Sequence, residues 1–124
     1  DQLQGLIGHA YNPEVRLRRG GQVELFFHEG VKGGLLSSTP LSAGKFAFVT
    51  VTRQKGTGSV YVNGKLEGTV DADFDCSSDR PMVLGRHSAT ASDYFSGTID
   101  DVMVYSRALS EKEVEQLWKS SGAE

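Results

Sequence analysis

Two adjacent carboxylic acids, Asp100 and Asp101, stand inside the apolar stretch TIDDVMVY near the end of the chain. Paired carboxylates can cleave a glycosidic bond, bind a metal ion or accept backbone hydrogen bonds. The alternating pattern predicts a β-strand, in which Asp100 shares a face with Val102 while Asp101 points the other way. Carboxylates on opposite faces cannot flank one glycosidic bond, so the pattern disfavours catalysis by this pair.

A carboxylate buried in such a strand needs partners, because an unpaired charge in the interior is strongly destabilising. Two interpretations of Asp100 therefore stay open. In the first, Asp100 has a structural role and accepts backbone N–H groups or pairs with Arg86 or Arg107. In the second, Asp100 supplies one oxygen ligand to a calcium ion, and backbone carbonyls supply others.

Other residue types with chemical potential form no complete motif. The acidic run DADFDCSSD begins like an EF-hand loop, but Cys76 and Met82 stand where that loop requires glycine and glutamate. Cys76 lies among acids rather than cations, so we predict no nucleophilic role for it. The three histidines are far apart in sequence and lack zinc-ligand spacing. The sequence also contains no nucleophile elbow and no glycine-rich phosphate loop.

Composition excludes several classes of protein. The 13 basic and 16 acidic residues are scattered and give a net charge of −3, so we expect no nucleic-acid partner. No apolar run approaches the ~20 residues of a membrane helix, so we expect no membrane insertion. A length of 124 residues suits a single domain over 1–124. The chain starts at Asp1 without a signal peptide, which favours a matured product or a piece of a larger protein.

Strand patterns dominate the sequence, and its 15 glycines against 3 prolines indicate many turns and an all-β fold. EVRLRRGGQVELFFH predicts a hairpin around Gly20 and Gly21, with a two-residue loop. SVYVNGKLEGTV predicts a second hairpin through Asn63 and Gly64, the strongest short hairpin signal. KFAFVTVTR is apolar on both faces and predicts a central strand. With RPMVLGRH and YFSGTIDDVMVY, the chain has about eight or nine strands, as in a sandwich or barrel.

The end of the chain predicts one helix. Ser110 is a good N-cap residue, and Glu113 three positions later completes a capping box. Leu109 before the cap can pack on Val114 as a hydrophobic staple. Trp118 continues the apolar stripe, so the helix is expected to pack one face on the β-structure.

The segments GSVYVNGKLEGT and MVLGRHSATASDYFSGTIDDVMVYSRALSEKEVEQLW resemble the concanavalin A-like jelly roll in its bacterial laminin-G-like form. The resemblance is close over the last two thirds of the chain and loose over the first third. It implies an antiparallel jelly-roll β-sandwich with one short C-terminal helix. Phe46 and Phe48 stand where this family usually has tryptophan. Family members also usually carry strands upstream of residue 1, so we expect open sheet edges or exposed core.

The resemblance implies a non-catalytic recognition module of a larger secreted, periplasmic or cell-surface bacterial protein that binds carbohydrate or a protein partner. It also supports the calcium interpretation of Asp100, because many related jelly rolls hold a structural calcium ion. A rival hypothesis is a structural domain that packs on an adjacent domain or subunit and binds no free ligand. A glycan-active enzyme ranks third. An exposed aromatic platform would favour the first hypothesis, and a large apolar patch the second.

A lectin-like site stacks sugar rings on aromatic side chains and adds a few polar groups. The polar loop GRHSATASDY lies beside the predicted Asp100 strand and is the predicted rim of such a site; the alternative is a solvated loop. The predicted ligand-binding residues are Tyr11, Asn12, Arg86, His87, Asp93 and Tyr94, and the predicted metal ligand is Asp100.

Overall fold

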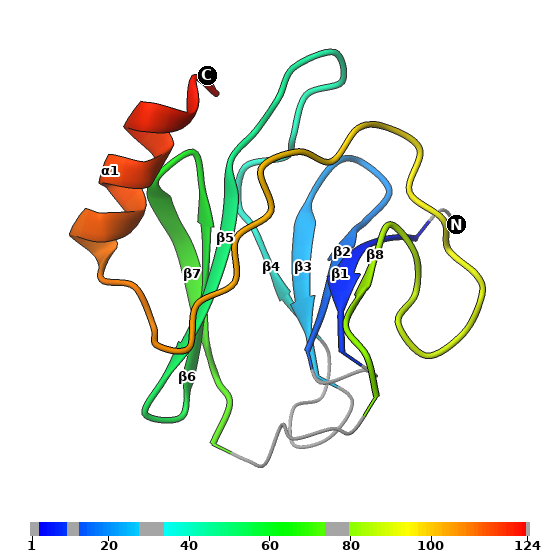
Figure 1. The fold of residues 1–124 in the computed structure, drawn as a ribbon, viewed down its shortest axis with the longest axis horizontal. Coiled ribbons are helices and arrows are strands. Elements are labelled where there is room, and N and C mark those ends of the chain that lie inside the picture. Colours follow the sequence, from blue (N-terminus) through cyan, green and yellow to red (C-terminus); the bar gives the residue numbers. More distant parts are fainter. Residues whose placement is uncertain (1–2, 10–12, 28–33, 74–79, 124) are drawn as a thin grey trace.

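The computed structural model describes residues 3–9, 13–27, 34–73 and 80–123, which form two antiparallel sheets facing each other (Figure 1). Sheet A has the strand order β4-β3-β2-β1-β8 and sheet B the order β5-β6-β7. The strands of sheet A are β1 (Gln4–Gly8), β2 (Glu14–Leu17), β3 (Val23–Phe26), β4 (Leu35–Leu36) and β8 (Val83–Leu84). Those of sheet B are β5 (Val49–Gln54), β6 (Thr57–Val62) and β7 (Lys65–Asp71). The helix α1 (Glu111–Ser121) lies on the face of sheet B turned away from sheet A (Figure 1). The predicted all-β sandwich with a closing helix is confirmed.

Apolar side chains from both sheets form the core between them, as the alternating patterns predict. The buried cluster consists of Val15, Val23, Leu25, Phe27, Val60, Val62 and Ala72. β4 packs against β7, and β3 packs against β6. The two sheets are therefore offset, and sheet A extends beyond sheet B on the side of β1 and β8. This offset leaves β5 opposite β2, and within the described residues no strand of sheet B lies opposite β1 or β8.

The side of the sandwich where β4 meets β7 is closed by polar contacts. Glu67 of β7 accepts hydrogen bonds from the Thr39 N–H at 2.6 Å and from the Ser38 hydroxyl at 3.0 Å. Burial alone would raise the pKa of Glu67, but these hydrogen bonds outweigh it and lower the pKa. The carboxylate therefore fixes the loop after β4 onto the other sheet.

The predicted β2–β3 hairpin is present, but its loop is longer than two residues. Leu17 pairs with Val23, so residues 18–22 form the connection. Gly20 and Gly21 have φ of 96° and 91°, the left-handed region that glycine adopts without strain. The Gly21 carbonyl accepts the Leu41 N–H at 2.7 Å. This contact with a distant segment holds the extra residues of the loop.

The predicted β6–β7 hairpin forms as expected. Asn63 and Gly64 have φ of 50° and 76°, as a type I′ turn requires, and Val62 pairs with Lys65 across the turn. Asn63 also exchanges two hydrogen bonds of 2.8 Å with the backbone of Phe48, through its N–H and its side-chain oxygen. The turn therefore positions the chain that enters β5.

The predicted capping box and staple of α1 are confirmed. The Ser110 hydroxyl accepts the Glu113 N–H, and the Glu113 carboxylate accepts the Ser110 N–H. Leu109 and Val114 are buried together with Tyr61 of β6, so the staple also attaches the helix to sheet B. Arg107 donates to both oxygens of Glu113, at 2.8 and 2.6 Å.

Two strand predictions are wrong. β5 starts at Val49 rather than Phe46, and it is an edge strand of sheet B within the described residues, not a central one. Residues 96–107 form no strand, because a strand needs a hydrogen-bonded neighbour and none of the described residues provides one. Asp101 has φ of 52°, which breaks the alternation of side chains that the sequence pattern predicts.

Replacing Gly64 with alanine tests the turn and its contact with the helix. An alanine Cβ at this position would lie 2.7 Å from the Trp118 ring, whereas at Gly44, with φ of 80°, it meets nothing within 4 Å. Gly44→Ala should cost about 1–2 kcal/mol through backbone strain alone. Gly64→Ala should cost more, because Trp118 must also move. Equal losses in urea-induced unfolding would show that Trp118 does not pack on the turn.

The Arg107–Glu113 pair predicts a pH dependence. Hydrogen bonds from Arg107, aided by the Ser110 N–H, lower the pKa of Glu113 from 4.5 to about 2. Ionised Glu113 therefore stabilises the fold above pH 4.5, and this stabilisation is lost as the pH falls towards 2. Glu113→Gln, which keeps a capping-box residue, should lower Tm at pH 6 and have progressively less effect on acidification. In an Arg107→Gln background the same substitution should change Tm little, and a pH-independent difference would contradict the assignment.

Candidate functional site

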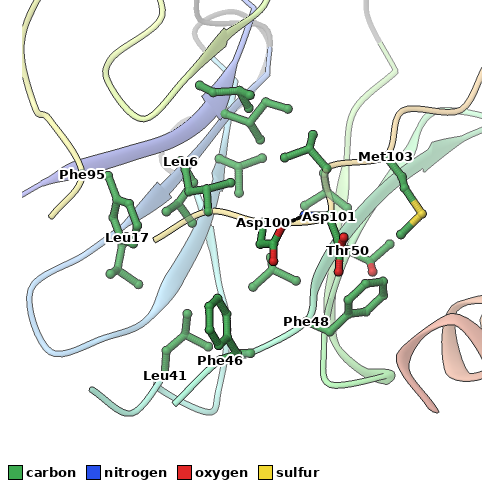
Figure 2. Close-up of a pocket in the computed structure, with 18 of the residues that line it drawn as sticks. Leu6, Leu17, Leu41, Phe46, Phe48, Thr50, Phe95, Asp100, Asp101 and Met103 are labelled. Atoms are coloured by element: carbon green, nitrogen blue, oxygen red, sulfur yellow. Dashed lines mark hydrogen bonds between the residues drawn. The ribbon is translucent and has the colours of Figure 1, made fainter. Parts of the chain in front are cut away.

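An open hollow between the two sheets, here called the groove, is the candidate site. Its volume is about 1170 Å³, and its lining includes residues of β5 and β8, which are edge strands of the two sheets. Figure 2 shows part of this lining. Sheet A contributes Leu6 and Leu17 to its wall, and sheet B contributes Val49 and Val51. Phe46, at the entry to β5, also lines the groove and is 59% exposed. The interior is therefore mainly apolar and reachable from solvent.

Residues 96–107, here called the strap, cross the mouth of the groove. In Figure 2 the strap begins after Phe95, on the sheet A side, and passes Met103 beside sheet B. All twelve of its residues are exposed, including five large apolar side chains: Ile99, Val102, Met103, Val104 and Tyr105. The strap forms no backbone–backbone hydrogen bond with any other described residue. Contiguous exposed apolar surface of this kind marks an interaction site in many proteins.

The two acids of the strap both line the groove. Figure 2 shows the Asp100 and Asp101 side chains directed to the same side of the strap, so the expected opposite orientation is wrong. The positive φ of Asp101 accounts for the change. Asp100 Oδ1 accepts the Asp101 N–H at 2.8 Å, and neither carboxylate forms an ion pair with a described residue.

The structural interpretation of Asp100 is wrong about its burial, and of the two kinds of partner that it offered only the backbone N–H is present. Asp100 is exposed rather than buried, and neither expected arginine pairs with it. Arg107 is bound to Glu113, and Arg86 donates to the carbonyls of His87 and Thr90 at 3.0 and 2.8 Å. The hydrogen bond from a backbone N–H is present, but the donor is the adjacent residue.

The calcium interpretation of Asp100 stays a prediction. Asp100 and Asp101 are the acids among the described residues that line the groove. Within the described ranges no group of three or more His, Cys, Asp or Glu side chains could hold a metal ion. Because Ca²⁺ takes six to eight oxygen ligands, these two carboxylates do not make a calcium site by themselves.

The predicted binding rim is an ordered loop that packs on β1. Arg86 stabilises the loop by donating hydrogen bonds to the carbonyls of His87 and Thr90. His87 is buried, and its Nδ1 accepts the Ala89 N–H at 3.1 Å. Asp93 has φ of 51°, and its carbonyl accepts the Gly5 N–H at 2.8 Å. These three residues come together in one loop, where the contacts described above hold the loop in place.

The remaining predicted ligand-binding residues differ in placement. Tyr94 is 62% exposed, so its ring is available to a ligand. Tyr11 and Asn12 lie outside the described residues. The four predicted residues that the structure describes therefore belong to one loop, and none of them lines the groove.

Glu14 anchors the rim loop, and sequence reasoning missed it. Its side chain is fully buried, and Oε1 accepts the Ser88 N–H at 2.7 Å and also the Ser88 hydroxyl. Oε2 has no hydrogen-bond partner among the described residues. An acid at an outward position of an alternating strand normally faces water, so the sequence carries no signal for this buried anchor.

The chain belongs to the concanavalin A-like lectin/glucanases superfamily, whose laminin G-type profile matches residues 3–115. It resembles a proposed carbohydrate binding protein from Bacteroides ovatus, with 22% identity and a TM-score of 0.76, over 94% of this chain and 36% of that one. It also resembles an S-layer domain-containing protein from Clostridium thermocellum, with 24% identity and a TM-score of 0.57, over 86% of this chain and 55% of that one. Identities this low show the fold alone. No curated protein matches the chain.

The chain thus spans about a third of one solved relative and about half of the other. Within the described residues, no helix has the length and apolar character needed to cross a membrane.

Removing the Glu14 carboxylate should loosen the rim loop. Glu14→Ala removes the buried carboxylate oxygen to which the Ser88 N–H and hydroxyl both donate and should lower stability by about 2–3 kcal/mol. Ser88→Ala removes only one of the two hydrogen bonds and should cost about 1 kcal/mol. Amide hydrogen exchange should speed up at residues 87–92 in both variants, more strongly in Glu14→Ala. Unchanged exchange in Glu14→Ala would show that the loop is held by other contacts.

Proposed function

We propose that this chain is a non-catalytic recognition domain of an extracellular bacterial protein and that it binds a protein segment in the groove. The observation that carries the proposal is the groove itself, an apolar hollow of about 1170 Å³ open to solvent between the sheets. Apolar side chains exposed along its mouth, Val104 at 66% among them, would be covered by such a partner. Burial of apolar surface is the main driving force of association.

The lining favours a protein segment over a free sugar. Leu6, Leu17, Val49 and Val51 present aliphatic carbons to the groove. A sugar ring carries hydroxyl groups that need hydrogen-bond partners, and an aliphatic wall leaves them unpaired. Apolar side chains of a polypeptide suit the same wall.

Absence of catalysis is part of the proposal. Hydrolysis of a glycosidic bond requires two carboxylates on either side of that bond. Asp100 and Asp101 are neighbours on one segment, and an oxygen of Asp100 already accepts a backbone N–H. This arrangement does not resemble a pair of acids facing each other across a substrate.

The extracellular context is supported by the solved relatives. One of them contains an S-layer domain, and the other is a proposed carbohydrate binding protein. The chain covers only part of each relative, so the proposal concerns this domain and not the activity of a whole protein.

Carbohydrate binding is the second candidate function. The exposed Tyr94 ring, at the end of the rim loop, is the observation that favours it, because sugars stack on exposed aromatic rings. The likeness to the Bacteroides ovatus protein supports the same candidate at the level of the fold.

Parallel selections distinguish the two candidates. The immobilised chain is offered to a random peptide library on phage and to a glycan array, with and without calcium. Phe46→Asp places a charge in the groove, whereas Leu36→Asp places one at a residue of sheet A that is 41% exposed and does not line the groove. We expect peptides that bind the wild type and Leu36→Asp but bind Phe46→Asp at least tenfold more weakly.

Three results would contradict the groove proposal. The first is the absence of any selected peptide, and the second is equal binding of the selected peptides to Phe46→Asp. The third is glycan binding that is abolished by Tyr94→Ala and unaffected by Phe46→Asp, which would establish the carbohydrate candidate at the rim loop instead.

A further inference from the structure

The turn between β6 and β7 consists of an asparagine followed by a glycine, Asn63 and Gly64. In such a pair the backbone nitrogen of the glycine can attack the side-chain amide carbon of the asparagine. The N–Cγ bond forms, and the amide NH2 group leaves as ammonia, which carries away the proton of the attacking nitrogen. The product is a cyclic imide, and water opens it to aspartate or to isoaspartate. Glycine favours the attack because it has no side chain to hinder it.

Asn63 is the asparagine of this sequence that has a suitable residue after it. The sequence contains two asparagines, and the other, Asn12, precedes Pro13. A proline nitrogen carries no hydrogen to lose, so it cannot close the imide. Asn12 is therefore a control within the same chain, because it experiences the same buffer, temperature and time as Asn63.

The folded turn holds both the backbone and the side chain of Asn63 in place. The Asn63 N–H donates to the Phe48 carbonyl, and Asn63 Oδ1 accepts the Phe48 N–H, each at 2.8 Å. To close the imide, the side chain must swing onto the Gly64 nitrogen. The imide also fixes a backbone rotation of Asn63 (ψ) that a type I′ turn does not have. The hydrogen bond from Phe48 and the turn itself must therefore open before Asn63 reacts.

Helix α1 protects the attacking nitrogen. Gly64 is buried, and a Cβ placed on it would lie 2.7 Å from the Trp118 ring, so Trp118 packs directly on the turn. The ring is itself held in place, because its Nε1 donates to the Ala123 carbonyl at 3.0 Å. Removal of the proton from the Gly64 nitrogen needs water or hydroxide beside it, which this packing disfavours. Loss of the Trp118 contact should therefore expose the turn to the reaction.

We propose that Asn63 is a deamidation site that the fold keeps nearly unreactive, and that its isoaspartate product detaches the β6–β7 turn from Phe48 and from α1. In isoaspartate the main chain runs through the side-chain carbon and is longer by one atom, which a two-residue turn does not accommodate. The oxygen that accepts the Phe48 N–H then belongs to the main chain. Aspartate, the other product, keeps a side-chain oxygen in that place. The inference goes beyond the proposed function, because it does not depend on what occupies the groove.

Ageing of the full chain tests the site and its protection. The chain is incubated in mildly alkaline buffer, both folded and unfolded in urea, and peptide mapping by mass spectrometry measures conversion at Asn63 and at Asn12. Trp118→Ala and Glu14→Ala are aged in parallel. Glu14 lies in the other sheet, so its variant controls for a general loss of stability. The aspartate and isoaspartate products are separated by chromatography, and Tm and amide exchange are measured for each.

We expect conversion at Asn63 to be at least about tenfold slower in the folded chain than in urea, because only the opened turn reacts. Asn12 should stay unconverted in both. Trp118→Ala should speed the reaction of the folded chain more than Glu14→Ala does when the two are compared at equal free energy of unfolding. The two products carry the same added charge, so the longer main chain should give the isoaspartate form alone a lower Tm and faster exchange of the Phe48 amide.

Four results would overturn the inference in different parts. Absence of conversion at Asn63 in the unfolded chain would rule out the site itself. Equal rates in the folded and unfolded chain would rule out protection by the fold. Equal acceleration by Trp118→Ala and Glu14→Ala at matched stability would show that the turn reacts only after global unfolding, which removes the role of α1. An isoaspartate form with the Tm and Phe48 exchange of the aspartate form would rule out detachment of the turn.

Discussion

The packing of sheet A on sheet B depends on apolar side chains between them, and these must be shielded from water on every side. On one side β4 packs on β7, and Glu67 bonds the following loop across the gap. On the other side sheet A extends beyond sheet B, and the strap is the described segment that crosses the opening. The core is thus closed by hydrogen-bonded structure on one side, whereas on the other side an exposed, irregular segment crosses the opening and leaves the groove reachable from solvent.

The same requirement accounts for the strap and the groove together. The strap is rich in valine, isoleucine and methionine, and such residues form strands when a neighbouring strand provides hydrogen bonds. In the described structure no such neighbour is present, so the strap stays irregular and its apolar side chains remain in solvent. Three properties then occur at one place: an open edge, an exposed apolar wall and carboxylates without a cationic partner. The proposed binding surface is the combination of the three.

Local chemistry explains which parts of the fold were predictable from sequence. The turn at Asn63 and Gly64 and the capping box at Ser110 and Glu113 each depend on a few consecutive residues, and both were predicted correctly. The closing helix packs on Tyr61 with the face that its apolar stripe indicated. The family resemblance identified the two-sheet fold, which the profile match over residues 3–115 confirms.

Features that depend on distant partners were not predictable in the same way. The pattern around Asp100 alternates like a strand, but a strand exists only where another strand pairs with it, and the pattern does not reveal the partner. The loop at Gly20 and Gly21 is longer than predicted, and its Gly21 carbonyl accepts a hydrogen bond from Leu41, a contact with a distant segment that the local sequence does not reveal. Glu14 reads as a solvent-facing residue until the rim loop folds over it. The family resemblance led us to expect open sheet edges or exposed core, but the sequence did not indicate which residues line the groove, because they come from segments far apart in the chain.

The central claim is that the open side of the sandwich is not completed by a strand in the free chain. Solution NMR of the full chain tests it directly, through backbone chemical shifts and amide exchange at residues 99–104. The account predicts shifts without strand character and exchange close to that of an unstructured peptide. Strand-like shifts with strongly protected amides in the free chain would contradict it, because the strap would then be paired and the groove closed.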